Sequence, residues 1–154
     1  MPIQYFCCQP ANRVLKDEWY ILTEDWICQW EYKDKFRRLF VPKGYIYDGG
    51  SIPRIAWTLS GLTPDGEGRA AYTAHDVLYR AKGGKKPSEW KGCKLVNENN
   101  NKVCCNKREA DWVLREFMIF ATVDKRKAYR AWRWVSMLGI FFWGHNPPSG
   151  NIPT

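Results

Sequence analysis

The sequence is poor in histidine and lacks the segments that carry a chain into or across a membrane. Only two of the 154 residues are histidines, His75 and His145. The first residues have neither a basic start nor an apolar run, so we expect no signal peptide and synthesis in the cytoplasm. The apolar run 134–143 is too short for a transmembrane helix, which needs about 20 residues.

The sequence also lacks internal repeats, low-complexity segments and a domain linker. A chain of 154 residues then fits one domain of common size. We expect a single domain over residues 1–154, with residues 1–47 mainly in strands, 68–143 mainly in helices, and 144–154 as an irregular tail. This order of strands and helices predicts an α+β fold.

The six cysteines show no Cys-x2-Cys spacing, which argues against a zinc ribbon. Reduced thiols are the simplest interpretation for a cytoplasmic product. The alternative is a disulfide from Cys93 to Cys104 or Cys105, since segment 94–103 has the pattern of a hairpin with an Asn-rich turn.

An antiparallel β-meander is predicted in the first third of the chain. Segments 19–23, 26–32 and 36–41 are rich in β-branched and aromatic residues with partial alternation, and 33–35 is a short polar turn. Segment 45–47 resumes an extended pattern.

About three helices are predicted after the meander. The first spans 68–81, which is rich in alanine. The second begins at 106–109, which resembles a capping box, and continues with apolar residues at helical spacing. The third is capped by Asp124 and runs from 125 to 143.

Charge and tryptophan content favour a binding surface. An excess of 24 Lys and Arg over 16 Asp and Glu gives a net charge of +8, which suits anionic partners, and nine tryptophans exceed what a core of this size normally uses. The third helix, basic at its start and apolar at its end, could lie on an anionic membrane surface or dock into another protein of an assembly. The alternative is that its apolar end packs into the core. Nucleic acid would suit the charge, but no reading motif is present.

His75 is the first candidate for chemistry, because a histidine can take a proton from water when a carboxylate orients its ring. On the predicted helix Asp76 adjoins it and Tyr79 lies one turn later. Asp111, from the next helix, would be the orienting carboxylate, and Tyr79 could hydrogen-bond it. The alternative is a buried His75–Asp111 pair that only ties two helices together.

Segment 47–53, with the sequence Tyr-Asp-Gly-Gly-Ser-Ile-Pro, is rich in turn formers. Asp76 and backbone oxygens near Tyr47, Gly49 and Gly50 could hold Ca²⁺, a hard ion that prefers oxygen ligands. The alternative is a tight turn before a helix in which Asp48 caps backbone amides.

Two resemblances rest on these residues. The 47–53 loop, Trp57, the His75–Tyr79 motif and Asp111 resemble an uncharacterised family of small proteins of tailed phages and prophages, over most of residues 36–140. This resemblance implies synthesis in a host cytoplasm, a place in the virion, and other virion proteins as partners.

The second resemblance is to phospholipase A2, particularly its compact viral form. The family's His-Asp-x-x-Tyr is matched by His75, Asp76 and Tyr79, and Asp111 stands for its orienting aspartate. Its calcium loop is matched by Tyr47 and Gly49, whereas Ser51 replaces a glycine. The resemblance implies a Ca²⁺-dependent hydrolase of phospholipid esters. The alternative hypothesis is a non-catalytic tail or capsid protein, structural or adaptor, in which the same residues form a structural tie.

Overall fold

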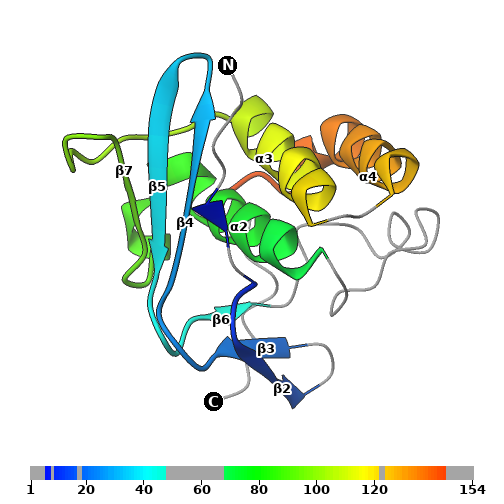
Figure 1. Ribbon diagram of the computed structural model, residues 1–154. Helices are drawn as coiled ribbons and strands as arrows, with labels where there is room; N and C mark the ends of the chain where they lie inside the picture. Colours follow the sequence, from blue (N-terminus) through cyan, green and yellow to red (C-terminus); the bar gives the residue numbers. More distant parts are fainter. Residues whose placement is uncertain (1–5, 8, 17–18, 48–67, 122–123, 145–154) are drawn as a thin grey trace.

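The computed structural model describes residues 6–7, 9–16, 19–47, 68–121 and 124–144. Within these residues, strands of two antiparallel sheets precede three α-helices, and one further strand lies between the first two helices, which confirms the predicted α+β class (Figure 1). The strands are short, and their bounds are β1 Phe6–Cys7, β2 Asn12–Lys16, β3 Trp19–Leu22, β4 Trp26–Tyr32, β5 Lys35–Val41, β6 Ile46–Tyr47 and β7 Lys94–Val96. The helices are α2 Arg69–Arg80, α3 Lys107–Phe120 and α4 Lys125–Leu138.

The β4–β5 hairpin is the centre of the larger sheet, whose strand order is β1-β4-β5-β7. Its two-residue turn consists of Lys33 and Asp34, both in the left-handed region with φ of 50° and 62°, which matches the twist of the flanking strands. The predicted strands and the polar turn between them are therefore confirmed.

The antiparallel strands of the predicted meander divide into two sheets between β3 and β4. Strand β3 pairs with β2 and β6 in a separate sheet, because the chain bends after Leu22 and its amide bonds the Tyr45 carbonyl at 3.0 Å. Asp25 then accepts a 2.8 Å hydrogen bond from the Lys43 amide, which fixes the bend. A polar bend of three residues thus separates the two sheets.

The predicted hairpin at 94–103 is only partly formed. Strand β7 pairs with β5 of the larger sheet, and Val96 makes a single bridge to Lys102. The disulfide alternative is wrong, since Cys93, Cys104 and Cys105 are all free thiols. Burial raises the pKa of the Cys93 thiol to about 12, which keeps it protonated and inert.

Side-chain caps start two of the helices where the sequence predicts them. Asn106 accepts a hydrogen bond from the Glu109 amide at 2.8 Å, and Asp124 accepts one from the Arg126 amide at 2.8 Å. The third helix is shorter than predicted, because α4 ends at Leu138 and gives way to the 3₁₀ turn η3, Gly139–Phe141.

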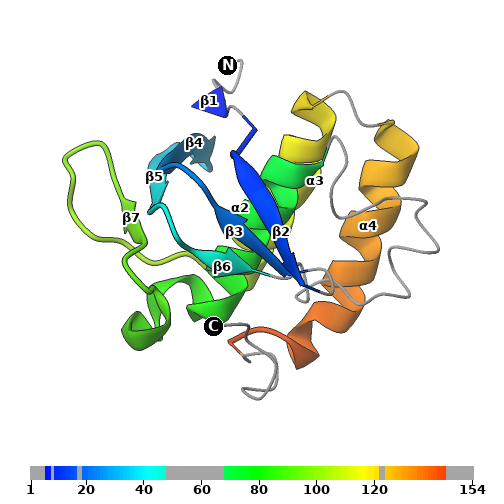
Figure 2. The same cartoon turned by 90° about the horizontal axis from the view of Figure 1, so that it is seen from below.

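The three helices lie on one side of the larger sheet, with α4 farthest from it (Figure 2). Helix α2 is the innermost: every residue from 70 to 80 is buried, although four of them, Thr73, His75, Asp76 and Arg80, are polar or charged. Buried polar groups need partners, so the surroundings of α2 must supply them. No helix in the described parts of the chain is long and apolar enough to span a bilayer.

Candidate functional site

The two residues that the sequence pairs across helices do meet. His75 Nε2, from α2, lies 3.0 Å from Asp111 Oδ1, from α3. His75 has 0% and Asp111 2% of its surface exposed, so this hydrogen bond is shielded from water. Because Asp111 is a carboxylate, it accepts, and Nε2 carries the proton. When the ring is neutral, its lone pair is then on Nδ1.

Two further side chains converge on the same carboxylate. The Tyr79 hydroxyl donates to Oδ1 of Asp111 at 2.5 Å, and Lys107 Nζ donates to Oδ2 at 2.7 Å. Lys107 also donates to the Val135 carbonyl of α4 at 3.1 Å. The carboxylate therefore joins α2, α3 and α4, and the four residues His75, Tyr79, Lys107 and Asp111 form what we call the Asp111 cluster.

These contacts set the charge of the cluster. Burial alone would raise the pKa of Asp111, but the hydrogen bonds that it accepts from His75, Lys107 and Tyr79 lower it. Burial and the Asp111 charge raise the pKa of Tyr79, so its hydroxyl keeps its proton and remains a donor. Asp111 is therefore an anion that fixes the orientation of His75.

The other ring nitrogen of His75 is in a different position. Nδ1 is buried and has no hydrogen-bond partner among the parts of the chain that the structure describes. The Tyr79 ring packs on the imidazole at 4.0 Å between centroids and holds the ring plane. The imidazole thus has one satisfied donor and one unsatisfied acceptor.

Asp76 serves a separate interaction. Its Oδ2 lies 3.4 Å from Arg80 Nε, one turn along α2, and the Nη1 atom of Arg80 donates to the Ile46 carbonyl at 2.7 Å. The guanidinium also lies over the rings of Trp19 and Tyr45. Asp76 and Arg80 therefore tie α2 to the smaller sheet.

The predicted calcium ligands are brought together only in part. Tyr47 lies in β6, where its hydroxyl accepts a hydrogen bond from Asn12, while Gly49 and Gly50 lie outside the described residues. Asp76 is already paired with a guanidinium, and the described residues contain no cluster of three metal-ligating side chains. Since Ca²⁺ takes six to eight oxygen ligands, the described donors do not fit this ion.

Glu109 is a buried charged residue that sequence reasoning missed as a site residue. Its Oε1 accepts from Trp30 Nε1 at 2.9 Å and lies 3.2 Å from Arg37 Nε. The capping-box pattern predicts that this side chain turns back to its own helix, whereas it reaches the larger sheet. Lys107 was also missed, although its spacing of four residues from Asp111 signals the ion pair.

The comparisons with known proteins agree with an uncharacterised family. No curated protein and no solved structure matches the chain. The model of a family described as "Protein of unknown function (DUF1353)" matches residues 22–135, which include β4, β5, α2, α3 and all four members of the Asp111 cluster. Because this match covers well over half of the chain, the protein belongs to the DUF1353 family.

Proposed function

We propose that the protein is a phage-encoded, virion-associated hydrolase in which His75 is the general base of a phospholipase A2-like site. The observation that carries this proposal is the state of the imidazole. Asp111 occupies Nε2, and Nδ1 is left as a buried acceptor without a partner in the described residues.

A structural histidine and a general base differ in what their ring nitrogens bind. A purely structural histidine gains most when both ring nitrogens are bonded, and a buried polar atom without a partner costs about 1–3 kcal/mol. A general base needs its acceptor nitrogen open to the water that it activates. Nδ1 of His75 is an acceptor without a bond, as a general base requires, and in this structure it is closed to solvent.

In the proposed reaction, His75 and Asp111 carry out the proton transfers. Nδ1 of His75 takes a proton from water, whose oxygen attacks the ester carbonyl, and Asp111 stabilises the resulting imidazolium. The carbon–oxygen bond to the lysophospholipid then breaks, and the proton passes from His75 to the leaving oxygen. Tyr79 and Lys107 hold Asp111 as positioning residues. No step is assigned to Ca²⁺, because the described donors do not fit it.

An anionic phospholipid surface is the proposed substrate surface. Arg126, Arg130 and Arg133 follow one another along α4 at helical spacing and are exposed, and Met137 continues the same line. Met137, Ile140 and Phe141 are 67%, 60% and 70% exposed. Cations beside an exposed apolar tip suit lipid headgroups and acyl chains. Because His75 is fully buried, the proposal requires that docking on this surface opens the site to water.

Fatty acid release from phosphatidylglycerol vesicles tests the proposal, with parallel samples in Ca²⁺ and in a chelator. The wild-type protein should release fatty acid, and His75→Asn should reduce the rate at least 100-fold. His145→Asn, the same change at the second histidine, should leave it within twofold. Equal release by wild-type protein and His75→Asn, or none by folded wild-type protein under either condition, would refute catalysis.

A second candidate is a non-catalytic structural or adaptor protein of the phage particle. The observation in its favour is that His75 has no exposed surface while Asp76 is neutralised by Arg80. On this hypothesis His75→Asn lowers stability and changes no activity, and the exposed residues of α4 contact another virion protein. Detection of the chain in purified particles, together with no fatty acid release, would favour it.

A further inference from the structure

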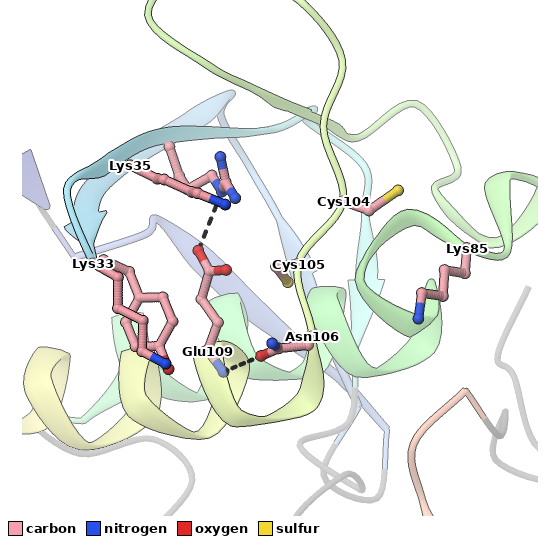
Figure 3. Close-up of a pocket in the computed structure, with 9 residues that line it drawn as sticks. Lys33, Lys35, Lys85, Cys104, Cys105, Asn106 and Glu109 are labelled. Carbon is pink, nitrogen blue, oxygen red and sulfur yellow. Dashed lines mark hydrogen bonds and ion pairs between the residues drawn. The ribbon is translucent and has the colours of Figure 1, made fainter.

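A pocket lies at the start of α3, and His75 is not among its lining residues. It is a pocket of about 410 Å³ between the β4–β5 turn, the segment after α2 and the start of α3 (Figure 3). Its lining residues are Tyr32, Lys33, Lys35, Arg37, Lys85, Cys104, Cys105, Asn106 and Glu109. None belongs to the Asp111 cluster, so the pocket shares no side chain with the proposed hydrolase site.

The lining carries four cationic side chains and a single carboxylate. That carboxylate, Glu109, is already bonded to Arg37 at 3.2 Å and to Trp30 at 2.9 Å. No ion pair in the described parts of the chain uses Lys33, Lys35 or Lys85. The pocket therefore has three positive charges for which its own walls supply no counter-charge.

The cations sit on opposite walls. Lys33 and Lys35 come from the β4–β5 hairpin, and Lys85 lies across the pocket from them, in the segment after α2 (Figure 3). All three lysines are exposed, whereas Arg37 is buried. A ligand between the walls would be approached by cations from two directions.

Backbone contacts hold these walls in place. The Cys105 amide donates to the Gly83 carbonyl at 2.9 Å, and a side chain on Gly83 would clash with the Cys105 carbonyl. This contact fixes the turn that leads to Lys85 against the segment that leads into α3. Asn106, which caps the N-terminus of α3, is one of the lining residues, so the positive end of the α3 dipole lies beside the pocket and adds to its positive potential.

We propose that this pocket binds a phosphate group of an organic phosphate. Cations on two walls and a helix N-terminus match the several oxygens and the charge of a phosphate. A volume of about 410 Å³ leaves room for the organic part beside Tyr32 and the Cys104 thiol. A soluble phosphomonoester and a lipid phosphate headgroup share this chemistry, and the experiment separates them.

Binding is measured with the full chain by titration calorimetry, using glycerol 3-phosphate and, separately, vesicles that contain phosphatidic acid. The pocket variant is Lys33→Gln/Lys35→Gln/Lys85→Gln. The control is Lys91→Gln/Lys94→Gln/Lys102→Gln, which removes the same charge from exposed lysines outside the pocket and, like the pocket variant, includes one position of positive φ. The pocket variant should lose at least tenfold in affinity for the phosphate group, and the control should stay within twofold.

Each result has a defined meaning. Pocket-dependent binding of glycerol 3-phosphate supports the proposal with a soluble source, and pocket-dependent binding of vesicles alone supports it with a lipid headgroup. Equal weakening by both triple variants would show a general charge effect and overturn it. Absence of saturable binding by the wild-type protein to either probe would also overturn it. Fatty acid release is not a readout here, so the two proposals fail separately.

Discussion

Lys107 and Asp111 lie one helical turn apart in α3, and the ammonium of Lys107 is 2.7 Å from the carboxylate oxygen that His75 and Tyr79 leave open. Both oxygens of Asp111 are therefore engaged. Since Lys107 also binds the Val135 carbonyl, the charge balance of the His75 site depends on α4 being docked. The predictions below follow from such links between elements.

Asp111→Asn should destabilise the fold at neutral pH by about 2 kcal/mol or more, because it leaves the partly buried Lys107 without its counter-charge. The pKa of Asp111 is lower in the folded state than its ordinary 3.8. The stabilisation that the Asp111 carboxylate gives the fold is thus complete above its ordinary pKa of 3.8, and it is lost as pH falls through the lower pKa of the folded state. Urea unfolding of both proteins from pH 7 to pH 3 measures the difference. A gap between wild type and variant that stays constant over this range would contradict the prediction.

Gly139→Ala should disturb the site from the 3₁₀ turn η3, because a methyl group there would clash with the Tyr79 hydroxyl. We expect a loss of about 1–3 kcal/mol in the free energy of unfolding. Tyr79→Phe removes the hydroxyl oxygen with which the new methyl group would clash. Gly139→Ala should therefore lower the free energy of unfolding by less in the Tyr79→Phe protein than in the wild type. A double-mutant cycle measures this coupling, and strict additivity would show that the two residues do not touch.

Glu109→Ala should be more damaging than its position near the end of a helix suggests. It leaves the Arg37 guanidinium, with 9% exposure, and the Trp30 indole without their acceptor, at a cost of about 3–5 kcal/mol. Replacing the pair together, as Arg37→Met/Glu109→Leu, should recover part of this loss because no unpaired charge remains. Chemical denaturation measures both proteins. A double variant less stable than Glu109→Ala would contradict the argument.

Gly83→Ala and Gly44→Ala form a matched pair of backbone tests. Both glycines have positive φ, at 67° and 89°, so each substitution carries a strain of about 1 kcal/mol. Only at Gly83 would the new carbon also strike the Cys105 carbonyl, whereas at Gly44 it meets nothing within 4 Å. Thermal unfolding should show the larger loss for Gly83→Ala. Equal losses would mean that the contact between the two segments is not tight.

Local pattern predicted much of the fold. The β4–β5 hairpin, the caps Asn106 and Asp124 and the start of α3 depend on neighbours in sequence, so alternation and capping residues reveal them. The separation of the strands into two sheets and the pairing of β7 with β5 depend on contacts between distant segments. No short-range pattern encodes such contacts.

The site shows the same division. The His75–Asp111–Tyr79 arrangement was predictable because each residue belongs to a recognisable motif. The pairing of Asp76 with Arg80 was missed, although its spacing of four residues fits an ion pair, because the resemblance assigned that carboxylate to calcium. The pocket beside Lys33 joins three segments far apart in the chain, and no motif marks it.

Glu109 and Asp111 are separated by one residue in α3 yet bind opposite neighbours, the sheet for one and α2 for the other. At 100° per residue their side chains diverge by about 200° around the helix axis. A single-residue insertion or deletion between them would rotate one carboxylate by about 100° relative to the other, so that only one of the two could keep its partners. The register of α3 is therefore locked from both sides, and natural variation in this helix should take the form of substitutions rather than changes of length.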